Sequence, residues 1–198
     1  MPWKFYNSSG ELQINDGGVS ASAAVFTGNV DLGSNLLVGN AGSTGIAISA
    51  NGEVTMAAQP AVYATGDSDP NNTGAGSEST IKFTERFDQN ADFNGTTTFT
   101  APVTGRYMFA VSVTVNPITS SMTDGNLQLK ISNLTQRHHT HAYNSYAVSQ
   151  GVYTQAISVL ADMDAADTAT ATLTISNGAG NTADIQAAST FFSVYLVA

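Results

Sequence analysis

Residues 109–115 read Phe109-Ala110-Val111-Ser112-Val113-Thr114-Val115, and this stretch decides the fold class. Its odd-numbered positions are apolar, and its even-numbered positions are small or polar. Because successive side chains of a strand point to opposite faces, the alternation predicts a strand with one face in a core and the other in water. The segment Leu127-Gln128-Leu129-Lys130-Ile131-Ser132 has the same period of two. Strands of this kind indicate a sheet with one buried face.

The rest of residues 59–198 carries further candidate strands, about nine in all, separated by clusters of turn-forming residues. The candidates are Ala61–Thr65, Thr80–Phe83, Thr97–Thr100, Tyr107–Val115, Gln128–Ser132, Ala142–Ser149, Tyr153–Val159, Thr168–Ile175 and Phe191–Leu196. So many short strands in one stretch predict an all-β head, either a β-sandwich or a jelly roll.

The composition fits an all-β class and excludes several functions. Thr, Ser, Asn and Gly number 24, 20, 16 and 18, which argues against a helical bundle or an α/β enzyme. A net charge of −9 argues against nucleic acid or an anionic membrane surface as a partner. No apolar run is long enough to span a membrane, and the start lacks the apolar core of a secretory signal. The absence of cysteine excludes disulfides and thiolate chemistry.

Residues 19–58 are nearly free of charge and contain short apolar runs such as Ile46-Ala47-Ile48. Runs of this length cannot close a core within one chain. We therefore expect residues 19–58 to form a short β-rich intertwined shaft in which three identical chains share a core; a flexible Gly/Ser-rich linker is the alternative. Residues 1–18, which include Trp3, Phe5 and Tyr6, are expected to be an N-terminal docking segment; packing of these aromatic residues against a neighbouring domain is the alternative.

Two stretches of this zone resemble shaft segments of bacteriophage tail fibres and spikes. The first runs Val25-Phe26-Thr27-Gly28-Asn29-Val30-Asp31-Leu32-Gly33-Ser34-Asn35-Leu36-Leu37-Val38-Gly39-Asn40, and the second runs from Gly45 to Val54. The resemblance covers about a fifth of the chain and rests on a low-complexity phrase. It implies a protein of the phage particle that is trimeric along its shaft.

The remainder, residues 59–198, resembles the globular head of complement component one subcomponent q, a member of the tumour-necrosis-factor jelly-roll superfamily. The resemblance is carried by Ile81-Lys82-Phe83, by Phe99-Thr100-Ala101-Pro102-Val103-Thr104-Gly105-Arg106-Tyr107-Met108-Phe109 and by the closing run Ser189–Leu196. It departs from the family at Phe192 and Ser193, and Ala166-Asp167 stands where the family has Gly-Asp. The resemblance implies a jelly roll of about ten strands that forms a compact homotrimer around an apolar axis.

Motifs for catalysis are missing from the chain. It contains no G-x-S-x-G, H-E-x-x-H, P-loop or G-x-G-x-x-G pattern, and all its histidines form one cluster. No pair of carboxylates stands out for glycoside hydrolysis. We therefore expect no enzymatic activity.

The histidine cluster is the sharpest polar feature. His139 and His141 lie two residues apart, so on a strand they would share a face, and imidazoles suit Zn, Ni or Fe(II). In a three-fold assembly with that face on the axis, they would hold a divalent metal. The resemblance to phage fibres, in which such H-x-H pairs occur, supports this hypothesis. A solvated loop and a receptor contact are the alternatives.

Two further groups of residues are candidates for binding. Tyr143, Tyr146 and Tyr153 form an aromatic, polar region that could contact a receptor, with ordinary strand packing as the alternative. Asp162, Asp164 and Asp167, like Asp67 and Asp69, have a spacing that suits Ca²⁺, although turn chemistry explains such residues equally well.

The sequence as a whole predicts a trimeric virion fibre or spike protein that attaches the particle to its host through the jelly-roll head. Its expected partners are two further copies of itself, other virion proteins at the N-terminus, and a host-surface glycan or protein. A purely structural virion protein, such as a capsid decoration or a tail-tip component, is the first alternative. A secreted cellular adhesion or signalling module is the second.

Overall fold

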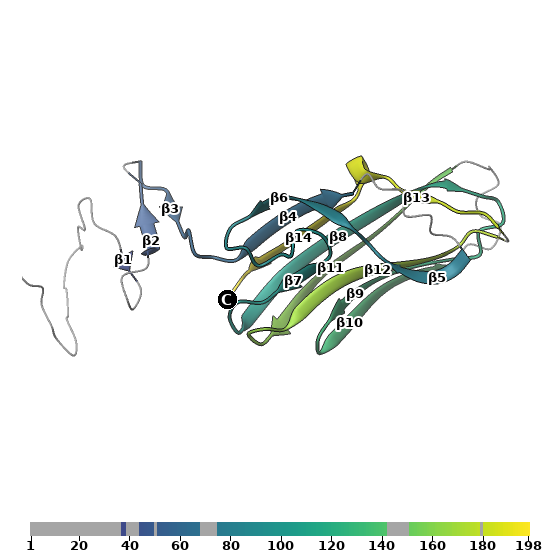
Figure 1. Cartoon of the computed structure of the whole chain (residues 1–198). Coiled ribbons are helices and arrows are strands. Elements are labelled where there is room, and N and C mark those ends of the chain that lie inside the picture. The colour runs from purple at the N-terminus through teal and green to yellow at the C-terminus, as the bar shows by residue number, and fades with distance from the viewer. Residues whose placement is uncertain (1–36, 39–43, 50, 68–74, 142–150, 179) are drawn as a thin grey trace, which may run out of the picture. The chain divides into compact units, whose positions relative to one another are not determined.

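The computed structural model describes residues 37–38, 44–49, 51–67, 75–141, 151–178 and 180–198; at 37, 38, 44, 75 and 136–141 it describes the backbone alone. These residues belong to one compact unit of the chain, Leu37–Ala198. They form strands and one short 3-10 helix, η2 (Ala187–Ser189), so the predicted all-β class is confirmed (Figure 1). Within the described residues there is no helix with the length and apolar content that crossing a membrane requires.

Three short antiparallel strands form a small sheet in the zone predicted to be the shaft. They are β1 (Leu37–Val38), β2 (Thr44–Ile48) and β3 (Val54–Thr55), in the order β1-β2-β3. The turn between β2 and β3 is closed by Ser49, whose Oγ accepts hydrogen bonds from the backbone N–H groups of Asn51 and Glu53. Gly52 supplies the positive φ of 91° that this turn needs.

The strands from β4 to β14 form a head of two antiparallel sheets. The first sheet has the order β10-β9-β12-β5, and β7 also pairs with β12. Its strands are β5 (Ala75–Thr80), β7 (Thr98–Thr100), β9 (Asp124–Ile131), β10 (Leu134–His141) and β12 (Thr168–Ser176). The second sheet has the order β11-β8-β14-β4-β6, with β13 paired to β8. Its strands are β4 (Ala61–Gly66), β6 (Phe83–Asp88), β8 (Gly105–Ile118), β11 (Gly151–Met163), β13 (Asp184–Ile185) and β14 (Phe191–Leu196).

The core lies between these two sheets, where the sequence alternation placed it. Phe109, Val111, Val113 and Val115 are all buried, which confirms the prediction from the deciding stretch. Aromatic rings join the layers: the Phe99 ring lies 5.9 Å from that of Phe109, which lies 6.0 Å from that of Phe192. Side chains of this size dominate the energetics of a core.

The predicted strand Thr80–Phe83 is wrong. The chain leaves the first sheet at Thr80 and enters the second at Phe83, and Ile81 and Lys82 carry it across. Ile81 and Phe83 are both buried and lie two residues apart. The same spacing is typical of a strand with one buried face, which is why the sequence predicted one here. The predicted strand Ala142–Ser149 lies outside the described residues.

The turn that differs from the complement-type pattern has a left-handed backbone. Ala166 has a φ of 74°, a conformation that glycine adopts without strain and alanine does not. Its N–H donates to the carbonyl of Ala101, and the N–H of Asp167 donates to that of Asp164. The tight connection between β11 and β12 is therefore kept at this position despite the loss of glycine.

The strand directions define two ends of the head. We call the end at which β4 begins the proximal end, and the opposite end the distal end. β8 and β12 run from proximal to distal, and the pairing makes β9, β11 and β14 run back. The connection 119–123 and the described residues of 177–183 therefore lie at the distal end, where β4 and β10 also end and β5 and β11 begin (Figure 1).

Candidate functional site

The outer face of the second sheet is uncharged over five strands. The strand registers group its outward residues into three rows across the sheet. They are Leu160, Met108, Tyr195 and Ala61; then Ser158, Ala110, Ser193, Tyr63 and Phe87; then Ala156, Ser112, Phe191, Thr65 and Thr84. We call these residues the assembly face. Charges stand at its margins, in the Arg106–Asp162 pair at 3.9 Å and in Arg86, whose Nε donates to Thr65.

Large apolar side chains on the assembly face are half exposed. Leu160 is 52% exposed, Tyr195 50% and Phe87 53%. The Tyr63 ring lies 6.2 Å from that of Phe87 and 6.3 Å from that of Phe191, so these aromatics form one cluster. Contiguous apolar surface of this kind on a soluble protein marks an interaction site.

The outer face of the first sheet is different in character. It carries Thr170, Thr172 and Thr174 on β12, beside Gln128 and Lys130 on β9. The Lys130 ammonium pairs with the Glu78 carboxylate, which also accepts from the Gln128 amide. The outer face of the first sheet is thus polar, with Gln128 and Thr172 themselves buried, whereas that of the second sheet is suited to a protein surface.

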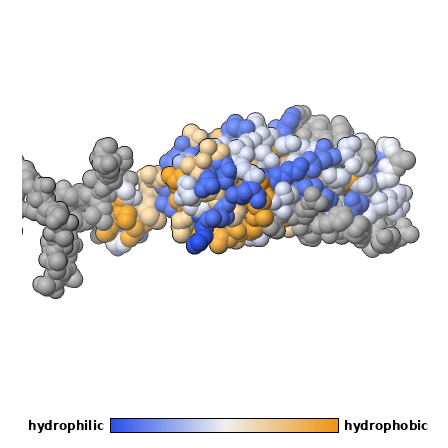
Figure 2. Space-filling view, turned by 90° about the horizontal axis from the view of Figure 1, so that it is seen from below, coloured by the Kyte–Doolittle hydropathy of each residue, from blue (hydrophilic) through white to orange (hydrophobic). Residues whose placement is uncertain are grey.

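Hydrophobic side chains of the head gather toward its proximal end. Figure 2 shows one side, on which orange residues concentrate at the end that holds the C-terminus and the described residues of the opposite end are polar or intermediate. Val103 and Val197 add to the exposed apolar surface of this end. The two ends are therefore chemically distinct.

The strands of the predicted shaft expose their apolar residues. Ile48 is 57% exposed, Val54 61% and Met56 45%. A single chain thus leaves these side chains in water, as the argument for shared burial requires. The side-chain amides of Gln89 and Asn90 donate hydrogen bonds to the backbone carbonyls of Met56 and Ala58. These bonds hold the segment that leads into β4 against the head.

The histidines lie on a strand, so the solvated-loop alternative is wrong. Leu134–His141 forms β10, and its register places His139 opposite Asn126 and His141 opposite Asp124, at the distal end of the sheet. The metal hypothesis stays a prediction, because the side chains of 136–141 lie outside the description. Among the residues whose side chains are described, no group of three or more His, Asp and Glu could hold a metal ion.

The three tyrosines fall in different places. Tyr143 and Tyr146 lie outside the described residues, on the connection 142–150 between distal strand ends. Tyr153 is only 5% exposed and packs its ring against Gly125, where an added Cβ would come within 2.6 Å of the Tyr153 Oη. Tyr153 is therefore a core-packing residue, and we do not count it among the residues that would contact a receptor. The sequence signal that Tyr153 faces the core was the run of apolar residues at the odd positions that follow it, Ile157, Val159 and Ala161.

The acidic residues near β12 form hydrogen bonds within and beside their own turn. The Asp167 carboxylate accepts the N–H of Asp164 at 2.9 Å and the Asn133 amide at 3.4 Å. This is the backbone role that Asp has in turns. Asp67 precedes the undescribed residues 68–74, which include Asp69.

A half-buried carboxyl, that of Asp92, lies at the proximal end. Burial, and then the nearby Asp88 carboxylate, raise the pKa of Asp92, although a hydrogen bond from Asn90 opposes the shift. Burial also raises the pKa of Tyr107, whose hydroxyl donates to the Val103 carbonyl at 2.7 Å.

The comparisons with solved structures concern the fold. The globular domain of zebrafish complement 1qA protein superposes with a TM-score of 0.51 at 16% identity, over 70% of this chain and 98% of that one. The head has the jelly-roll fold. Murine APRIL matches with a TM-score of 0.48 at 10% identity, over 70% of this chain and 99% of its own. No family model and no curated protein sequence matches the chain.

We did not predict the assembly face of the jelly-roll head from the sequence. Its members come from strands far apart in the chain, and many of them are Ala or Ser, which in one strand look like solvent-facing residues. The signal that could have found it is the set of large apolar residues at outward positions, namely Met108, Leu160 and Tyr195.

Proposed function

We propose that this chain is a trimeric fibre or spike protein on the surface of a phage virion, which attaches the particle to its host through the jelly-roll head. The observation that carries the proposal is the uncharged assembly face with its half-exposed Leu160, Tyr195 and Phe87. A closed three-fold ring of identical heads would bury this face on every copy. The exposed Ile48, Val54 and Met56 require the same arrangement in the shaft.

The phage assignment is supported by the sequence of residues 25–40, which resembles shaft segments of phage fibres. The two parts of the chain agree, since both need partners and identical chains satisfy both. Assembly into a trimer would support attachment. Three heads on one shaft would present their distal ends together, so that one weak contact with the host surface raises the effective concentration for the next.

Self-association is tested by the mass of the full chain in solution. Three chains of 20.5 kDa give about 61.5 kDa by multiplication, which light scattering at micromolar concentration measures directly. A mass of one chain would overturn the trimer.

Attachment is tested by competition. Purified protein in excess should block adsorption of the phage that encodes it, and labelled protein should bind the host cells. A trimer that is found on virions but neither binds cells nor competes would instead be a purely structural component, such as a capsid decoration or tail-tip piece.

A further inference from the structure

We infer that the distal end of the head binds a neutral glycan, that is, a polysaccharide whose repeating unit carries no charge. This inference rests on the proposed attachment function and names the ligand class for it. The distal end is the part of the head farthest along the strands from the segment that enters β4. It is built by connections that differ in chemistry from those at the proximal end.

Two distal connections are described, and neither contains a charged residue. They are residues 119–123 and 177–183. Their exposed side chains are hydroxyls and amides, from Ser120, Ser121, Thr123, Asn181 and Thr182. Proximal connections instead carry Asp92, Asp164 and Asp167. The carboxylates of the distal end lie outside these two connections, at Asp67 after β4, at Asp124 and at Asp184.

The two connections are held together by one buried side chain. Asn177 is fully buried, and its Oδ1 accepts the N–H of Thr119 at 2.7 Å while the Thr119 hydroxyl donates to its carbonyl at 2.6 Å. The Asn177 amide donates to the carbonyl of Pro117 at 3.2 Å. Gly178 lies so close to Ser121 that an added Cβ would be 2.6 Å from the Ser121 Cβ. The exposed hydroxyls and amides are therefore fixed in advance, which lowers the entropy cost of binding.

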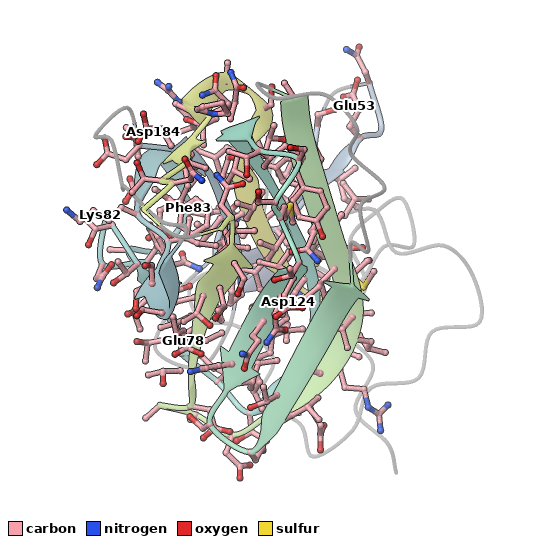
Figure 3. The ribbon with its side chains drawn as sticks, turned by 90° about the vertical axis from the view of Figure 1, so that its right-hand side faces the viewer. Glu53, Glu78, Lys82, Phe83, Asp124 and Asp184 are labelled. Carbon is pink, nitrogen blue, oxygen red and sulfur yellow. The ribbon has the colours of Figure 1, made fainter. Side chains whose placement is uncertain are left out.

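Each of these connections ends at a carboxylate. Asp124 begins β9 and Asp184 begins β13, and they lie well apart when the distal end faces the viewer (Figure 3). Carboxylate oxygens accept hydrogen bonds strongly from hydroxyl donors such as those of a sugar. Lys82 lies at the margin of this view and points away from the centre.

The same chemistry disfavours the other ligand classes. An anionic glycan needs Lys or Arg, and a charge-free surface with carboxylates at its rim offers repulsion instead. A protein partner needs apolar or aromatic anchors at the centre of its interface. Of the exposed large apolar residues in the described part, only Val152 lies at a distal strand end.

The test uses the full-length trimer on an array of bacterial surface polysaccharides that have neutral or charged repeating units. We expect binding to at least one neutral polysaccharide. The double variant Asn181→Ala with Thr182→Ala, and separately Ser121→Ala, should weaken that binding by at least about tenfold, the equivalent of one lost hydrogen bond. Thr135→Ala is the matched control, because Thr135 is an exposed hydroxyl residue on β10 away from the distal end. An unchanged melting temperature shows that the variants fold.

Two results would overturn the glycan inference: binding confined to charged polysaccharides, or distal variants that bind as tightly as the unaltered protein. Its failure can be told apart from failure of attachment itself. Cell binding that survives periodate oxidation of glycans and is lost after protease treatment leaves attachment standing and makes the ligand a protein. A trimer that binds no cells removes the attachment function.

Discussion

Replacing Leu160 by aspartate should dissociate the proposed trimer without unfolding the head. Leu160 stands in the first row of the assembly face, opposite Met108 on the neighbouring strand. It is 52% exposed in the single chain, so the core does not depend on its outer half. In the trimer, that outer half would be covered by a second copy.

The size of the effect follows from this exposure. Complete burial of a leucine side chain is worth about 1.5–3 kcal/mol, so covering the exposed half contributes roughly 1 kcal/mol in each chain. Three symmetric copies give about 3 kcal/mol for the trimer, or roughly a hundredfold in its association constant. Aspartate adds the cost of removing a carboxylate from water, so a hundredfold is the least that we expect.

Sedimentation equilibrium or light scattering across a dilution series measures this constant. Leu134→Asp is the matched control, because Leu134 is 37% exposed and lies on β10 in the first sheet, outside the assembly face. The control should stay trimeric at concentrations where Leu160→Asp is monomeric, and both should keep their β-type circular dichroism. If the two variants dissociate alike, or neither does, the assembly face is not the interface.

Four predictions concern the stability of the head and are checked by urea or thermal denaturation. Gly125→Ala should destabilise by about 1–3 kcal/mol, because the new Cβ would lie 2.6 Å from the Tyr153 hydroxyl; a neutral result would mean that the ring moves freely. Asn177→Ala should cost about 1–3 kcal/mol by leaving the Thr119 N–H without its partner. Ala166→Gly should raise stability by up to about 1 kcal/mol, since the φ of 74° suits glycine; a loss would refute the strain. Folding raises the pKa of Asp92 above 3.8, so the ionised carboxylate lowers the stability of the fold at neutral pH. This stability should be regained as the pH falls through the folded pKa toward 3.8. Asp92→Asn should therefore raise the stability at pH 7 and make it less dependent on pH over that range.

The alternation of apolar and polar residues was enough to predict the core. In Phe109 to Val115 the period of two is local, so it can be read without knowing any partner strand. The same rule failed at Ile81 and Phe83, because a chain that crosses between two layers keeps both side chains in the core without forming a strand.

The assembly face could not be predicted in this way, because the register between its strands depends on pairing between residues far apart in the chain. Met108 and Tyr195 are 87 positions apart in numbering, yet they lie opposite each other on β8 and β14. Only the pairing of strands turns isolated outward residues into a patch. The histidines show the same limit, since the sequence could not place His141 opposite Asp124, a residue of the preceding strand.

The surfaces that we propose for assembly and for recognition lie at opposite ends of the same strands. On the outer face of β8, the side chains change from Met108 and Ala110 to Ser112 and Thr114 toward the distal end, and on β11 they change from Leu160 to Thr154. An apolar surface at the distal tips would bring separate particles together, whereas at the proximal end of the proposed trimer it would be covered by identical neighbours. Substitutions in the first row of the assembly face should therefore change the oligomeric state while each released head keeps its intrinsic affinity for ligand. Distal substitutions should change affinity in a trimer that stays intact, so the two proposals can be refuted independently.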